Sequence, residues 1–125
     1  MTYRELSFAC SVCHTLLEER SPGQLGCGGC RRVLVGPETL AELLHDAAPD
    51  IRRRKGVLAF PQPANVPRRV CPVCSEEMLP GILFEATVDQ CARDGIWIAQ
   101  DDLPRMLEVA RERFEQRRKD RRPRT

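Results

Sequence analysis

Residues 10–30 read CSVCHTLLEERSPGQLGCGGC, a stretch that holds two Cys-x-x-Cys pairs with thirteen residues between them. Each pair, Cys10/Cys13 and Cys27/Cys30, can place two thiolates on one tight turn, called a zinc knuckle. The two glycines inside the second pair suit such a turn, since glycine tolerates positive φ. Four thiolates from two knuckles complete the tetrahedral coordination of structural zinc. The sequence therefore predicts a zinc ribbon here.

Other cofactors use similar motifs. Residues 10–14 match the C-x-x-C-H string of haem attachment, but no export signal lies beside them. A redox-active pair favours a βαβ setting, which the surrounding pattern lacks. A rubredoxin-like iron site has similar spacing, and spacing alone does not separate iron from zinc. We expect zinc and keep iron-based electron transfer as an alternative.

Residues 71–94 read CPVCSEEMLPGILFEATVDQCARD and repeat the pattern with one change. Cys71, Cys74 and Cys91 supply three thiolates, and Asp94 stands where the fourth cysteine is expected. A carboxylate oxygen is an acceptable zinc ligand, so we expect a second zinc ion with Asp94 as its fourth ligand.

Two other interpretations of this second site stay open. In one, the site no longer binds metal and is held by packing of Trp97, Leu79 and Phe84. In the other, three cysteines leave a coordination position for water, as in a catalytic zinc site. His14 and His45 are further candidates for the fourth ligand, although a lone histidine is more often solvated or packed.

Each cysteine region is followed by a short apolar strand and then an amphipathic helix. Residues 33–35 and 96–98 are the expected strands after the knuckles, and residues 82–84 and 86–88 are the expected ribbon of the second region. Pro37 suits the first turn of one helix, and Asp101 or Asp102 can cap the other. The predicted fold class is small α+β, with tandem zinc ribbons of short antiparallel strands, each followed by an α-helix.

The predicted organisation has four parts. Residues 1–47 form an N-terminal module and residues 48–69 a linker rich in proline and arginine, in which the apolar run 57–60 can dock on a module. Residues 70–120 form a C-terminal module with a longer helix, and residues 121–125 a basic tail. Each module is small enough that a metal is expected to supplement its hydrophobic core.

Charge alternates along the 125 residues, although the net charge is only +2. The net charges are −3 for residues 1–50, +6 for 51–70, −6 for 71–110 and +5 for 111–125. No segment has the apolar length of a signal peptide or of a membrane span, so we expect a cytoplasmic protein. Paired cysteines in a reducing compartment, and their odd number, favour metal over disulfides.

Residues 71–103 resemble the transcription-factor-IIB-type zinc-binding domain family of bacterial proteins. The resemblance rests on Cys71, Pro72, Cys74, Met78, Val88, Asp89, Cys91, Gly95, Trp97 and Leu103. Asp94 departs from the family pattern, which has Cys or His at that position. Residues 10–44 resemble a looser copy, with all four cysteines, no proline in the first pair and Val33 at the position of the tryptophan. The resemblance implies zinc and a small β-ribbon, and it implies transcription only weakly.

These features favour a non-enzymatic interaction module over an enzyme. No phosphate loop, H-E-x-x-H motif or Ser/His/Asp set accompanies the cysteines, and no small-molecule substrate is indicated. A protein partner is expected. Nucleic acid is a second candidate partner, through the basic segment Arg52, Arg53, Arg54 and Lys55 and through residues 117–124, since arginine runs bind phosphates without reading sequence.

Overall fold

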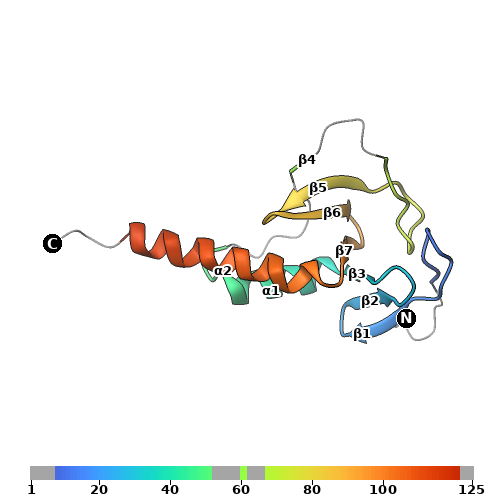
Figure 1. The fold of residues 1–125 in the computed structure, drawn as a ribbon, viewed down its shortest axis with the longest axis horizontal. Coiled ribbons are helices and arrows are strands. Elements are labelled where there is room, and N and C mark those ends of the chain that lie inside the picture. The colour runs from blue at the N-terminus through green and yellow to red at the C-terminus, as the bar shows by residue number, and fades with distance from the viewer. Residues whose placement is uncertain (1–7, 52–59, 62–66, 122–125) are drawn as a thin grey trace.

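A computed structural model describes residues 8–51, 60–61 and 67–121 (Figure 1). The predictions for the basic segment at 52–55, and for the end of the tail, lie outside these residues. The strands are β1 (Glu18–Ser21), β2 (Gln24–Cys27), β3 (Arg32–Val35), β4 (Phe60–Pro61), β5 (Leu79–Leu83), β6 (Ala86–Cys91) and β7 (Gly95–Ala99), and the helices are α1 (Pro37–Ala47) and α2 (Asp102–Asp120). This is the small α+β fold expected from the sequence.

All seven strands belong to one antiparallel sheet in the order β1-β2-β3-β7-β6-β5-β4. The two cysteine regions meet where β3 pairs with β7, with Leu34 opposite Trp97. The division into modules at 1–47 and 70–120 stays a prediction, since strands of both segments share this sheet. Within the predicted linker, Phe60 pairs with Ile82 of β5, so part of the apolar run docks on the sheet, while residues 57–59 lie outside the described part.

The strand register corrects one sequence alignment. Cys27 pairs with Arg32, five positions further on, whereas Cys91 pairs with Gly95, only four positions further on. The first region therefore has one extra residue in its second turn. As a result Leu34, and not Val33, takes the position that corresponds to Trp97, and the prediction for Val33 is wrong. These two corresponding residues are each other's partners at the centre of the sheet.

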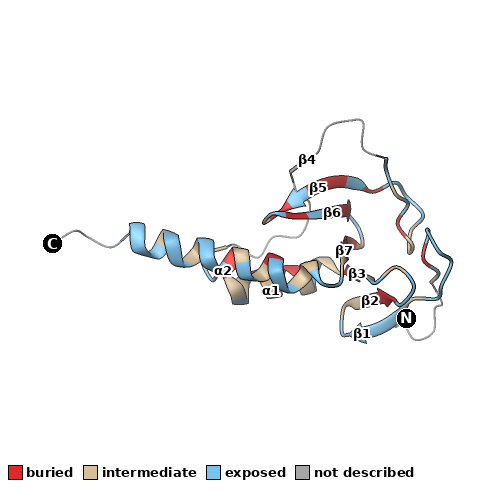
Figure 2. Cartoon of the chain, viewed as in Figure 1, coloured by how far each residue is buried: buried red, intermediate tan, exposed pale blue. Residues whose placement is uncertain are grey.

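The two faces of the sheet carry different cores. Figure 1 shows both helices extending from one face, and the cysteine-bearing turns on the other. The helix-side core is aliphatic and consists of Val33, Val35, Leu40, Leu44, Leu83, Ala86, Val88, Ile96, Ile98, Met106 and Ala110. The core on the other face consists of Cys10, Leu25, Cys27, Leu34, Cys71, Met78, Cys91 and Trp97. Burial is concentrated in the central strands, in the turns that carry Cys10 and Cys71 and in the near ends of the helices, whereas β1 is exposed (Figure 2).

The helix ends follow the sequence in part. Pro37 lies in the first turn of α1, as predicted. Asp101 precedes α2, but its side chain makes no capping hydrogen bond, so the predicted cap by Asp101 is not formed. Beyond α1, Asp50 accepts two hydrogen bonds from the Arg117 guanidinium, at 2.6 and 2.7 Å. This contact lowers the pKa of the Asp50 carboxyl and fastens the end of α1 to α2.

The turn between β5 and β6 is strained. Leu83 pairs with Ala86, so Phe84 and Glu85 form a two-residue loop, with φ of 45° and 66°. Such loops favour Asn-Gly because both positions need positive φ. Here α2 holds the turn: the Arg113 guanidinium lies 5.6 Å from the centre of the Phe84 ring and 3.6 Å from a Glu85 carboxylate oxygen.

Glu85→Gly is expected to stabilise the protein slightly, by about 0.5–1 kcal/mol. Glycine removes a left-handed strain of about 1–2 kcal/mol, which exceeds the few tenths lost with an exposed ion pair and the added freedom of the unfolded chain. Thermal unfolding with excess zinc measures the change. Glu85→Gln is the matched control, because it removes the charge and keeps the strain. A Glu85→Gly variant less stable than Glu85→Gln would contradict this account.

Candidate metal centres

The structure brings all eight predicted ligands together in two groups. One contains Cys10, Cys13, Cys27 and Cys30, and the other contains Cys71, Cys74, Cys91 and Asp94. Within each group the ligand atoms all lie within 4.8 Å of one another. Neither group includes His14 or His45, and the His45 ring instead lies 3.2 Å from the carbonyl oxygen of Ile51.

The first pair of cysteines in one group and the first pair in the other lie on two turns with the same backbone conformation. His14 and Ser75, which directly follow these pairs, have φ of 62° and 65°. Three backbone hydrogen bonds recur with equal lengths in the two turns. In the first turn they are Cys10 N to Thr15 O at 2.8 Å, His14 N to Cys10 O at 3.0 Å and Leu17 N to Phe8 O at 2.7 Å. In the second they are Cys71 N to Glu76 O at 2.8 Å, Ser75 N to Cys71 O at 3.0 Å and Met78 N to Arg69 O at 2.7 Å. The two turns also touch, since the Ser11 hydroxyl donates to the Val70 carbonyl at 2.8 Å.

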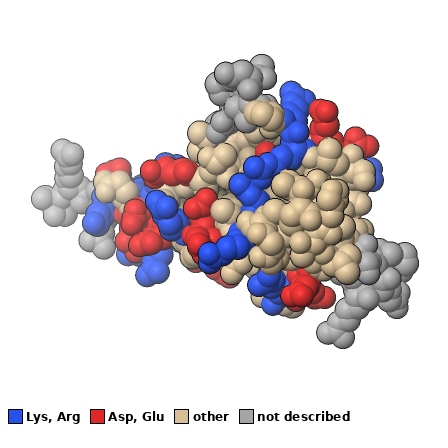
Figure 3. All heavy atoms as spheres, turned by 45° about the vertical axis from the view of Figure 1, so that its right-hand side comes forward, with Lys and Arg blue, Asp and Glu red and all other residues tan. Residues whose placement is uncertain are grey.

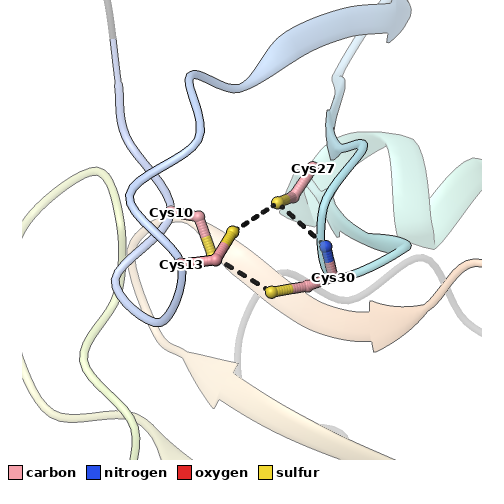
Figure 4. Close-up of side chains that lie close together, drawn as sticks. All are labelled: Cys10, Cys13, Cys27 and Cys30. Carbon is pink, nitrogen blue, oxygen red and sulfur yellow. Dashed lines mark hydrogen bonds between the residues drawn. The ribbon is translucent and has the colours of Figure 1, made fainter.

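The four sulfurs of the first group fit a tetrahedral metal ion. They point toward a common centre (Figure 4), with 3.7 Å between the sulfurs of Cys10 and Cys30 and 3.4 Å between those of Cys13 and Cys27. Tetrahedral zinc with bonds of about 2.3 Å separates its sulfurs by roughly 3.8 Å. The backbone N–H of Cys30 donates to the Cys27 sulfur at 3.4 Å, the kind of support that orients metal-bound thiolates.

The second group fits the same geometry with a mixed donor set. The sulfurs of Cys74 and Cys91 are 3.5 Å apart. Oδ2 of Asp94 lies 3.3 Å from the Cys71 sulfur and 3.6 Å from the Cys91 sulfur. For zinc bonds of about 2.3 Å to sulfur and about 2.0 Å to oxygen, the tetrahedral sulfur–oxygen separation is roughly 3.5 Å. The Asp94 carboxylate therefore stands where a fourth ligand is needed.

Electrostatics give each sulfur of the first group its own character. The hydroxyl and backbone of Thr15 lower the pKa of the exposed Cys13 thiol to about 6. The hydrogen bond with Cys13, followed by burial, raises the pKa of Cys30 to about 12, and burial raises that of Cys27. In the second group burial raises the pKa of Cys71 to about 12. Cys27, Cys30 and Cys71, whose pKa values are raised, retain their protons at neutral pH without a cation, whereas Cys13 readily loses its own. A metal ion that binds these groups would therefore displace protons from the buried cysteines.

The surroundings of the clusters include residues that the sequence did not single out as site residues. The hydroxyl oxygen of Thr15 lies 3.2 Å from the Cys13 sulfur. The only indication of this contact in the sequence is that Thr15 is a polar residue two positions after Cys13. Asp89 lies opposite Trp97 in the sheet, and burial raises its pKa. The positive charge of the Arg69 guanidinium, 3.8 Å away, lowers the pKa of Asp89 and so partly offsets the effect of burial. Of these residues only Thr15 contacts a cluster sulfur, and none of them belongs to either group of candidate ligands.

The fold and the two clusters define the class of protein. It is a small α+β protein with two cysteine-rich groups, each of which could hold a metal ion. Comparison with protein-family models, curated proteins and solved structures found no match. Membership of the transcription-factor-IIB-type family therefore stays a prediction that rests on the motif. Among the described residues, no helix is long and apolar enough to cross a membrane.

Proposed function

We propose that the protein binds two structural zinc ions in tandem zinc ribbons and acts as a non-enzymatic interaction module. The observation that carries the proposal is the pair of four-donor groups at tetrahedral spacing. Zinc is favoured over iron because a rubredoxin-like iron site uses four thiolates, and the second group has three and a carboxylate. The two cysteine-bearing turns have the same hydrogen bonds, so it is simpler to assume that both groups bind the same metal. Zinc suits both donor sets.

The packing supports a metal at the second group over a site that no longer binds one. The alternative relied on Trp97, Leu79 and Phe84 to hold the site. Trp97 does lie in the core beside the cysteines. Phe84, however, packs on the helix side of the sheet, and Leu79 is 45% exposed. The remaining core is small without a metal to cross-link it.

The outer surface supports a partner protein. The end of the molecule that carries the cysteine-bearing turns presents a broad area with few charged side chains, bordered by charged ones (Figure 3). Val12 and Leu16 on the first turn are 55% and 61% exposed, and Val70 beside the second is 39% exposed. Uncharged areas with exposed apolar side chains are typical of protein interaction sites.

The stoichiometry of zinc and its dependence on Asp94 test the proposal. Native mass spectrometry of the wild type is expected to show two zinc ions. Asp94→Ala is expected to keep one, because removal of a ligand opens the second site. Asp94→Cys is expected to keep two and to bind the second about tenfold more tightly in chelator competition, since thiolates are softer ligands. Asp101→Ala, at an exposed carboxylate outside the cluster, is the matched control.

Each other outcome has a definite meaning. One zinc ion in both wild type and Asp94→Ala would exclude Asp94 as a ligand. Two ions in Asp94→Ala would show that three thiolates suffice and would favour the interpretation with an open coordination position. A red protein with iron in place of zinc would contradict the proposed metal and favour electron transfer.

A further inference from the structure

The two helices leave an open groove between them on the side of the molecule away from the metal clusters. The groove has a volume of about 650 Å³. Its lining consists of apolar Leu43, Ala47, Pro49, Pro104, Leu107 and Phe114 and charged Asp46, Glu108, Arg111 and Glu115. On α2 the lining residues recur at spacings of three and four, so they form one stripe along the helix. Arg118 is the next position on that stripe.

Charge is distributed unequally along this pair of helices. Residues 37–50 carry four carboxylates and no lysine or arginine, whereas residues 111–121 carry six basic side chains and three carboxylates. Asp46 and Glu108 form no salt bridge with another described residue, and neither do Arg118 and Lys119. The groove is therefore acidic, and the far end of α2, which is largely exposed (Figure 2), is basic.

We propose that α2 of a second copy of the chain fills this groove, so that two molecules form an antiparallel four-helix dimer. The apolar floor favours a helix as occupant, because helices bury such stripes against one another. Charge decides the direction: antiparallel helices place the basic end of each α2 beside the acidic groove of the other copy, whereas parallel helices would bring the two basic ends together. Antiparallel packing also aligns the helix dipoles favourably.

The stripe also suggests a register. If Arg118 of one copy lies opposite Glu108 of the other, the two-fold axis crosses α2 near residue 113. The two Phe114 side chains then meet close to the axis, where an isologous interface repeats each contact. Phe114 is only half-buried within one chain, so the dimer would remove the remaining apolar surface from water. This inference goes beyond the proposed metal binding and does not depend on it.

A charge exchange tests the dimer. Analytical ultracentrifugation of the wild type, loaded with zinc, is expected to give twice the chain mass. Asp46→Lys/Glu108→Lys makes the groove basic, and Arg118→Glu/Lys119→Glu makes the helix end acidic. Each double variant alone is expected to dimerise about 100-fold more weakly, because like charges then face each other. An equimolar mixture of the two is expected to form a heterodimer, since opposite charges are restored at both grooves.

A second pair of variants tests the apolar floor. Phe114→Glu is expected to give a monomer, while Leu16→Glu, the same kind of change at an apolar side chain on the opposite end of the molecule, leaves the dimer intact. Zinc content and Trp97 fluorescence confirm folding of each variant. A monomeric wild type at 100 µM, on the order of a hundred times a micromolar dissociation constant, would overturn the proposal. Dimers that survive all of these variants, or a charge-exchanged mixture that stays monomeric, would overturn it as well.

Discussion

Removal of zinc by a chelator under reducing conditions is expected to unfold the core around Trp97. Trp97 is the only tryptophan of the chain and is 1% exposed, so its fluorescence emission should shift to longer wavelength as the metals leave. Structural zinc contributes about 10–16 kcal/mol of apparent binding free energy in small domains, which is comparable to the whole stability of about 5–15 kcal/mol of an ordinary domain. Fluorescence, read against zinc content, measures the effect, and re-addition of zinc should reverse it.

The composition of this core explains the size of the effect. Four of its eight buried members are cysteines of the two proposed metal sites, and the others are Leu25, Leu34, Met78 and Trp97. With so few apolar side chains, burial alone cannot offset the entropy of ordering two sets of turns. The aliphatic core on the other face contains no ligand. Circular dichroism is therefore expected to retain part of its helical signal after the tryptophan signal has changed.

A single substitution separates the two clusters in this experiment. Cys27→Ser, at a fully buried cysteine of the first proposed site, is expected to lose the first zinc ion and to shift the Trp97 emission without a chelator. All seven cysteines belong to the clusters, so no cysteine outside them serves as a control, and zinc re-addition to the wild type takes that place. Unchanged emission in metal-free protein would show that packing alone holds the core.

The local parts of this structure could be predicted from the sequence, because each has a local cause. The Cys-x-x-Cys spacing brings two sulfurs onto one turn whatever surrounds it, and the strands after each cluster follow from short apolar runs. Pro37 indicates the start of α1 for the same reason. The grouping of Asp94 with three cysteines was also accessible, since the repeat aligns it with Cys30.

The long-range parts were not accessible to the same reasoning. β3 is four residues long, and nothing in Arg32–Val35 distinguishes β7 from any other partner. The additional residue near Arg31, which has φ of 54°, shifts the register of β3 by one and reverses which side chains face each core. An alignment of the two regions on their cysteines therefore matches Trp97 with Val33, whereas the structure matches it with Leu34. The support that Thr15 gives to Cys13 likewise depends on folded geometry.

Gly95→Ala is expected to destabilise the protein by about 3–5 kcal/mol, combining backbone strain with overpacking. Gly95 has φ of 107°, a region that favours glycine. A Cβ at this position would lie 1.9 Å from the carbonyl oxygen of Val35 and 3.0 Å from the Cα of Gly36. Both are backbone atoms of the opposing segment, so relief requires that β3 and β7 move apart. Thermal unfolding with excess zinc measures the loss.

The place of Gly95 makes this substitution a test of the joined sheet. The residue follows Asp94, the proposed fourth ligand, and precedes Ile96, the partner of Val35 where the two cysteine regions meet. Displacement of Gly95 should loosen the pairing of β3 with β7 and also shift the neighbouring Asp94 carboxylate. Gly95→Ala is therefore expected to weaken zinc binding at the second proposed site as well. Gly28→Ala is the matched control, because its Cβ would meet only an Arg20 side-chain nitrogen at 3.9 Å. If both alanine variants unfold within about 0.5 kcal/mol of each other, the spread of ordinary surface substitutions, β3 and β7 do not pack as closely as the structure places them.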